Sequence, residues 1–189
     1  SNPLGFDWTT PSLKAAAAQI RVSAGATDNT ADTDTSGLSA NFKISAKMTV
    51  LSPNAENNPL WQVGDTTRNI TWNSIPSSGG GVANVDISYS TTGAGGAFTS
   101  IANDVSNTGT CAWTPLPDSI SNNVFVRVQD SADVDGLDVS DTAFSIAGNL
   151  SLEVANGDQP LGGETWPVYK ATPVELAQTQ QIIWTSTGT

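Results

Sequence analysis

Hydrophobic and polar residues alternate in several short stretches of the chain. In the stretch NVDISYS (84–90), Val85, Ile87 and Tyr89 fall on one face, and polar residues fall on the other. A period of two is typical of a β-strand that buries one face. The pattern predicts strands in these stretches: 48–52, 60–65, 68–74, 83–91, 97–102, 109–115, 123–130 and 142–147.

Segments rich in Gly, Pro, Asn and Asp separate these stretches. Examples are TTGAGG (91–96), NDVSNTG (103–109) and DSADVDGLDVSD (130–141). Such residues favour turns, and a crossover helix would need a periodic segment of about ten residues or more. Many short strands separated by turn residues predict an all-β fold, namely an antiparallel Ig-like or fibronectin-III-like β-sandwich.

The chain also repeats itself. The Trp residues form pairs that are separated by 105, 105 and 112 residues: Trp8 and Trp113, Trp61 and Trp166, Trp72 and Trp184. The segment 19–44 matches 125–146, and 48–65 matches 150–170. This spacing has the length of a small β-sandwich, so the sequence predicts tandem β-sandwich repeats.

The repeat divides the chain into three parts. Residues 47–147 are expected to form a complete unit, 1–46 the carboxyl-terminal strands of a preceding unit, and 148–189 the amino-terminal strands of a following unit. Aromatic residues in alternating strands pack inside such units. We therefore expect the following residues in the cores: Trp72, Trp113, Trp8, Trp184, Phe144 and Phe42.

Three segments carry a resemblance to a known family. They are NITWNS (69–74), IANDVSNTGTCAWTP (101–115) and VFVRVQDSADVDGLDVSDTAFSI (124–146). They resemble the Ig-like module of the Ser/Thr-rich GPI-anchored family, first named for yeast cell-wall glucan-synthesis proteins. Similar modules occur in tandem in large bacterial and archaeal surface proteins. The resemblance implies an Ig-like fold; fungal members imply β-glucan assembly, whereas the low Lys content here looks more like a prokaryotic surface protein.

Composition limits the partners. The net charge is −11, and the seven Lys and Arg residues are spread singly along the chain. No basic stripe is present to neutralise phosphates, so nucleic acid is not an expected partner. The sequence has no run of 18 apolar residues, so insertion into a membrane is not expected. The residue usage is typical of extracellular or cell-surface proteins.

The acidic stretch 130–141 is a candidate metal site. Ca²⁺ takes six to eight oxygen ligands, and carboxylates around a Gly turn can supply them. The candidate ligands are Asp130, Asp133, Asp135 and Asp138. The spacing is not that of an EF-hand. The alternative is a solvated connection between two strands that binds no ion, and Ca²⁺ is the one cofactor that the sequence supports.

Catalytic chemistry is not expected. The chain has no His, so a Ser–His–Asp triad is excluded, and Cys111 has no base beside it in the sequence. A glycosidase needs two carboxylates facing one cleft, and Asp65, Asp86 and Asp104 are scattered. We therefore predict no enzyme activity and no catalytic residue.

The predicted function is a structural spacer or assembly module of an extracellular surface protein of the adhesin, surface-layer, sheath or filament type. Short links between units restrict bending, which predicts a semi-rigid rod. The expected partners are neighbouring repeats or copies of the chain itself, whose partial end units are open to pairing head to tail. The alternatives are a carbohydrate- or wall-binding module that uses Trp166, Tyr169 or Phe98, or a non-catalytic accessory domain of a secreted enzyme.

Overall fold

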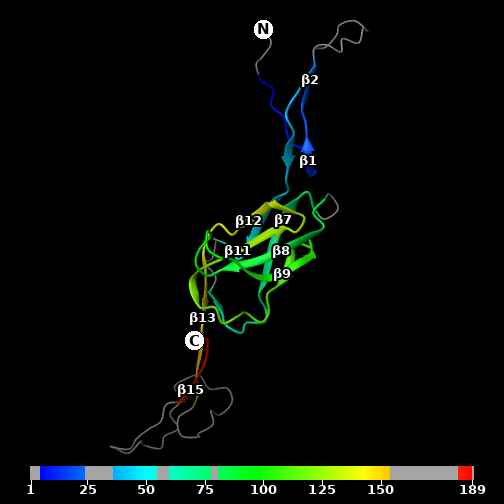
Figure 1. Ribbon diagram of the computed structural model, residues 1–189. Helices are drawn as coiled ribbons and strands as arrows, with labels where there is room; N and C mark the ends of the chain where they lie inside the picture. Colours follow the sequence, from blue (N-terminus) through cyan, green and yellow to red (C-terminus); the bar gives the residue numbers. More distant parts are fainter. Residues whose placement is uncertain (1–4, 24–35, 55–59, 78–80, 154–182, 189) are drawn as a thin grey trace, which may run out of the picture.

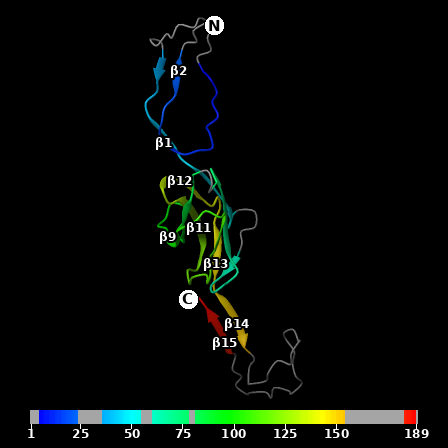
Figure 2. The same cartoon turned by 90° about the vertical axis from the view of Figure 1, so that its right-hand side faces the viewer.

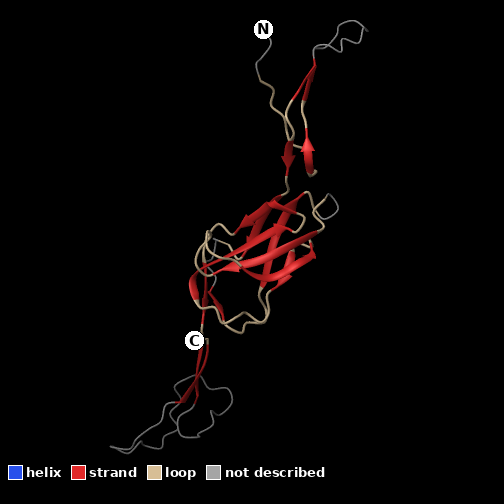
Figure 3. Cartoon of the chain, viewed as in Figure 1, coloured by secondary structure: helices blue, strands red, loops and turns tan. Residues whose placement is uncertain are grey.

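The computed structural model describes residues 5–23, 36–54, 60–77, 81–153 and 183–188. Within these ranges every regular element is a β-strand, and no helix occurs (Figure 3). The prediction of an all-β fold with antiparallel sheets is confirmed. The Ig-like or fibronectin-III-like type stays a prediction.

Strands β5 to β13, between Lys47 and Ala147, form the central unit. A three-stranded antiparallel sheet forms one side of it, in the order β10-β7-β5. Its strands are β5 (Lys47–Ser52), β7 (Asn69–Ile75) and β10 (Thr110–Ala112). In β7 the residues Ile70 and Trp72 point to the same face and are buried, as the alternating pattern predicts.

A six-stranded sheet forms the other side, in the order β6-β13-β11-β8-β9, with β12 paired to β11. Its strands are β6 (Leu60–Gln62), β8 (Asn84–Ser90), β9 (Thr99–Ser106), β11 (Ser121–Asp130), β12 (Asp133–Val139) and β13 (Phe144–Ala147). The pair formed by β13 and β6 is parallel, and the other pairs of this sheet are antiparallel.

Two narrow ribbons extend from opposite ends of the central unit (Figures 1 and 2). The amino-terminal ribbon pairs β1 (Ala15–Ala18) with β4 (Phe42–Ile44) and β2 (Arg21–Ser23) with β3 (Ser36–Leu38). The carboxyl-terminal ribbon pairs β14 (Asn149–Glu153) with β15 (Ile183–Thr187).

The hydrophobic core lies between the two sheets of the central unit. Both sheets contribute to it, and its members in the described residues all fall between Ala46 and Ile146. An aromatic cluster closes one part of the core. The ring centroids of Trp61 and Phe144 lie 4.9 Å apart, and those of Trp61 and Trp113 lie 5.9 Å apart.

The indole of Trp72 has a polar partner inside this core. Its Nε1–H donates to Asn107 Oδ1 at 2.8 Å. The amide nitrogen of Asn107 donates to Ser74 Oγ at 2.8 Å and to the Val82 carbonyl at 3.1 Å. Because a buried polar group without a partner is costly, Asn107 is what allows an indole to occupy this position.

Two of the predicted core residues lie elsewhere. Trp72, Trp113 and Phe144 are buried, and Phe42 is half-buried. Trp8 and Trp184, in contrast, are 46 % and 58 % exposed, so their predicted core positions are wrong for the described structure. The reason is that each lies on a terminal segment over which no second sheet packs among the described residues.

The stretch 130–141 also differs from its prediction as a loop, because most of it is β12. Two of its outward residues, Val134 and Leu137, are apolar and are 68 % and 41 % exposed, whereas Asp133 and Gly136 face inward. A Cβ on Gly136 would lie 3.3 Å from the side chains of Ala46 and Asp130, so the small residue permits this close packing. Because polar residues face inward and apolar residues face outward in this strand, the alternation of the sequence did not predict it.

The first prediction concerns Asn107. Asn107→Ala leaves the Trp72 indole N–H and the Val82 carbonyl without this partner in the core, and we expect the free energy of unfolding to fall by about 2–4 kcal/mol. Urea unfolding followed by Trp fluorescence measures the change. Asn103→Ala, at an exposed position, is the matched control and should change stability by less than about 0.5 kcal/mol. Equal effects of the two variants would contradict the role given to Asn107.

Candidate functional site at the junctions between units

The amino-terminal ribbon repeats the strand pairing of the six-stranded sheet. Counterparts are residues that occupy the same place in the sequence repeat or in the strand pairing of two units. Ala15 lies opposite Ile44 and Ala18 opposite Phe42, just as Ser121 lies opposite Ile146 and Val124 opposite Phe144. Both pairings carry an irregularity at the same place. The β2–β3 pair likewise corresponds to the β11–β12 pair, because Arg21 lies opposite Leu38 as Arg127 lies opposite Val139.

The aromatic contacts repeat as well. The rings of Trp8 and Phe42 meet edge to face at 6.2 Å and 79°. Their counterparts Trp113 and Phe144 meet at 6.5 Å and 80°. Because the sequence repeat and the ring geometry agree, the amino-terminal ribbon has the local structure of the last strands of the central unit.

The carboxyl-terminal ribbon repeats the strand pairing of the three-stranded sheet. Leu152 lies opposite Trp184, as Val50 lies opposite Trp72. Asn149 lies opposite Thr187, as Lys47 lies opposite Ile75. This ribbon therefore has the strand register of the first strands of the central unit.

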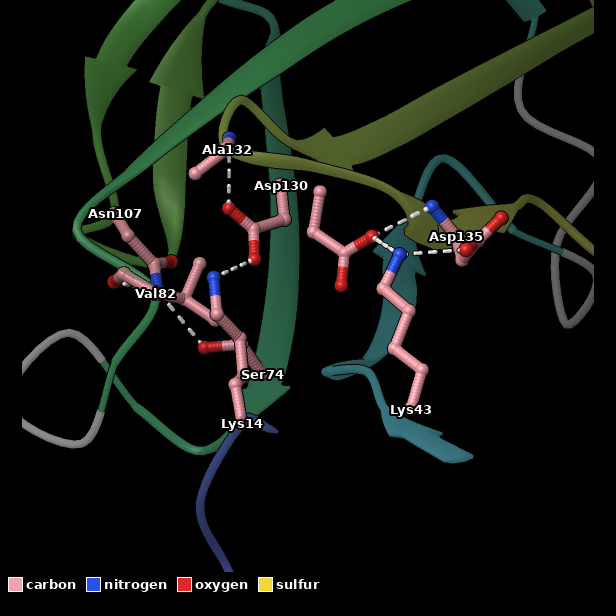
Figure 4. A network of polar contacts seen from close by, with 9 residues as sticks. Lys14, Lys43, Ser74, Val82, Asn107, Asp130, Ala132 and Asp135 are labelled. Carbon is pink, nitrogen blue, oxygen red and sulfur yellow. Dashed lines mark hydrogen bonds and ion pairs between the residues drawn. The ribbon is translucent and has the colours of Figure 1, made fainter. Parts of the chain in front are cut away.

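Lys14 joins the amino-terminal ribbon to the central unit. Its ammonium group forms an ion pair with Asp130, whose side chain is almost fully buried at the end of β11 (Figure 4). Asp130 also accepts a hydrogen bond from the backbone N–H of Ala132 at 3.0 Å. A buried carboxylate needs a counter-charge, and here it comes from a residue outside the central unit.

Lys43 makes a second contact across the same junction. Its ammonium group donates to Asp133 and, at 2.6 Å, to Asp135 Oδ2, both on β12. The hydrogen bond from Lys43 is the main cause that lowers the pKa of Asp133. In turn, the hydrogen bonds to Asp133 and Asp135 raise the pKa of Lys43. Ion pairs with two lysines of the amino-terminal ribbon thus hold the end of β11 and the start of β12.

The candidate Ca²⁺ ligands therefore have protein partners. Asp130 binds Lys14, and Asp133 and Asp135 bind Lys43. Asp138 Oδ2 accepts the Val50 backbone N–H at 2.7 Å, which ties β12 to β5. In the part of the chain that the structure describes, no three acidic, His or Cys side chains gather as a metal site would require. Ca²⁺ binding stays a prediction.

Two glycines lie where the carboxyl-terminal ribbon meets the central unit. A Cβ on Gly188 would lie 3.0 Å from Ile120 Cδ1 and 3.1 Å from Val63 Cγ2. A Cβ on Gly148 would lie 2.9 Å from the Thr187 carbonyl oxygen. The φ of Gly188 is +92°, a conformation that other residues rarely adopt. This second junction is therefore closely packed and apolar, whereas the first is ionic.

A separate hollow lies on the outer face of the six-stranded sheet. Phe98, Arg127, Asp86, Asn103 and Gln129 line it. The guanidinium carbon of Arg127 lies 4.4 Å from the centroid of the Phe98 ring. The Arg127 Nε is buried and has no hydrogen-bond partner among the described residues. Phe98 is one of the three aromatic residues that the sequence offers for sugar binding. The other two, Trp166 and Tyr169, lie outside the described residues.

Sequence reasoning missed Lys14 and Lys43. These lysines are separated from their partners by 116 and 90 residues, so no local motif connects them.

The one Cys of the chain is partly buried, and burial raises the pKa of its thiol. That shift lowers the thiolate fraction of Cys111 at neutral pH.

Comparisons with protein-family models, with curated proteins and with solved structures find no match to this chain. The resemblance to the glucan-synthesis family therefore stays a prediction. Within the described ranges, no helix is long and apolar enough to cross a membrane.

The second prediction tests the ion pair of Lys14 with Asp130. Lys14→Met leaves the buried Asp130 carboxylate without its counter-charge. Because Lys14 is 20 % exposed and water screens the pair in part, we expect a loss of about 2–3 kcal/mol in the free energy of unfolding. Thermal and urea unfolding measure it. Lys47→Met, at an exposed site, is the control, and adding Asp130→Asn to Lys14→Met should restore part of the loss. No recovery in the double variant would refute the explanation.

The third prediction concerns pH. Because the pKa of Asp133 is lowered in the folded chain, its stabilising effect is complete above its ordinary pKa of about 3.9 and is lost as the pH falls through the lowered value. The raised pKa of Lys43 predicts loss on the alkaline side, as the pH rises above about 10.4. Unfolding temperatures measured across the pH range test both the loss of stability at acid pH and the loss at alkaline pH. Asp133→Asn should flatten the fall of the unfolding temperature on the acid side; an unchanged fall in this variant would contradict the assignment.

Proposed function

We propose that the chain is a semi-rigid spacer or assembly module of an extracellular surface repeat protein. The observation that carries this proposal is that each ribbon repeats a strand register of the central unit: β1 and β4 repeat that of β11 and β13, and β14 and β15 repeat that of β5 and β7. Repeated β-units in a row build length, and each unit contacts only its neighbours. The Ig-like type of the unit, and its resemblance to the glucan-synthesis module, form part of the same proposal.

The links between units support stiffness. Strand β4 ends at Ile44 and β5 begins at Lys47. Strand β13 ends at Ala147 and β14 begins at Asn149. Links of one or two residues leave little room for bending, in contrast to a flexible linker.

The contacts at each junction favour a fixed angle as well. The pairs formed by Lys14 and Lys43 hold the amino-terminal ribbon to the β11–β12 turn. At the other end, Gly148 and Gly188 permit close packing against Ile120. Both links thus combine a short connection with close contacts, which is what a stiff spacer needs. The extracellular location rests on composition alone.

Carbohydrate binding is the second candidate function. It is favoured by the hollow in which Arg127 stacks on Phe98 and in which its buried Nε has no hydrogen-bond partner among the residues that the structure describes. Polar groups beside an aromatic face suit a sugar, and a guanidinium suits an acidic one. Isothermal titration with β-glucan and with an acidic polysaccharide tests this function, and binding that Phe98→Ala abolishes would support it.

The fourth prediction tests the stiffness of the first junction. Spin labels are placed at Ala17→Cys and Thr99→Cys, both exposed positions, in a chain carrying Cys111→Ser. Pulsed electron resonance should give one narrow distance distribution, because the junction is short and ionic. Inserting a Gly-Ser-Gly segment after Ser45 should broaden it. An equally broad distribution without the insertion would refute the spacer proposal.

A further inference from the structure

The apolar side chains exposed on the terminal segments are counterparts of residues buried in the central unit. The exposed residues are Trp8, Ile20, Val22, Leu150 and Trp184, which are 42 % to 70 % exposed. Their counterparts are Trp113, Val126, Val128, Met48 and Trp72, each 5 % exposed or less. The same kind of surface is therefore covered in one place and open in two others.

The two open surfaces are complementary halves. The amino-terminal ribbon corresponds to β11, β12 and β13, and the carboxyl-terminal ribbon to β5 and β7. In the central unit these two sets face each other, because Trp72 and Val50 of one set share a core with Val126 and Val128 of the other. The central unit thus displays the interface that the two ribbons can form.

Strands β6, β8, β9 and β10 of the central unit have no counterpart among the described strands of the ribbons. Of these, β8 and β9 form an antiparallel hairpin at one edge of the six-stranded sheet. Without them, the pairing of β11 with β12 and β13 remains possible, because those partners lie on the other side of β11. Joining the ribbons therefore supplies the counterparts of β5 and β7 in one layer and of β11, β12 and β13 in the other.

The ribbons of one chain cannot cover each other. They extend from opposite ends of the central unit, which lies between them (Figures 1 and 2). We propose that the carboxyl-terminal ribbon of one copy of this chain packs on the amino-terminal ribbon of a second copy, with Trp184 and Leu150 covering Val22 and Ile20. The contact joins different surfaces, so each added copy leaves one free ribbon at each end, and the assembly is an open filament. This interface goes beyond the spacer proposal, which would stand for a monomeric chain.

The fifth prediction tests this interface on the full 189-residue chain. In sedimentation velocity at physiological salt, the weight-average mass should rise with concentration beyond that of a dimer. Trp184→Ala or Val22→Asp should each raise the apparent dissociation constant by roughly 100-fold, as expected for truncating or charging a central contact. Val134→Ala, at an exposed position on β12, is the control and should assemble as the unchanged chain does. All these positions are exposed, so circular dichroism and the unfolding temperature should show the central unit intact.

Mixing the two defective chains tests the polarity of the interface. The Trp184→Ala chain retains its amino-terminal ribbon, and the Val22→Asp chain retains its carboxyl-terminal ribbon. Each alone should be monomeric, whereas an equimolar mixture should form heterodimers and stop there, because both remaining ends are defective. A strictly monomeric unchanged chain, assembly by Trp184→Ala alone, or a monomeric mixture would each overturn the proposal. None of these results would alter the distances that test the spacer proposal.

Discussion

A β-sheet with one apolar face requires a second layer to cover that face. The central unit meets this requirement, because its three-stranded and six-stranded sheets bury Trp72, Phe144 and a set of aliphatic side chains between them. The ribbons repeat the strand register of those sheets without their second layer. Trp184 consequently lies in the open although its counterpart Trp72 is buried. Local sequence sets the strand register here, and burial is set by what covers the strand.

This difference explains what the sequence could predict. Strong alternation located β5, β7, β8 and β11, and the spacing of the Trp residues indicated the repeated register. The exposure of Trp8 and Trp184 could not be predicted, because it depends on a partner layer and not on the neighbouring residues. Strand β12 escaped prediction since Val134 faces outward while Asp133 and Gly136 face inward. Its pairing with β11 and the Asp138 contact to β5 stabilise it instead.

The ionic junction was hidden for a similar reason. The composition shows seven scattered cations, and nothing near Lys14 in the sequence points to Asp130. The fold brings these residues together because β1 and the end of β11 meet at the junction. The carboxylates of the acidic stretch, which the sequence offers as Ca²⁺ ligands, hold lysines and a backbone N–H in the described structure. A cation that took Asp133 and Asp135 as ligands would compete with Lys43 for the same carboxylate oxygens. Binding of Ca²⁺ there would therefore weaken the ion pairs that hold the first junction.

The two kinds of contact respond differently to the solvent. The Lys43 pairs are partly exposed, so salt screens them and loosens the first junction. Salt has the opposite effect on contacts between the apolar ribbon faces of two copies. Screening the net charge of −11 reduces the repulsion between copies and so favours these contacts. Under the proposed spacer function and assembly, ionic strength therefore shifts the balance from a stiff, separate chain at low salt toward a more flexible, associating chain at high salt. The first junction thus depends on charge, whereas the second junction and the proposed contact between copies depend on apolar packing.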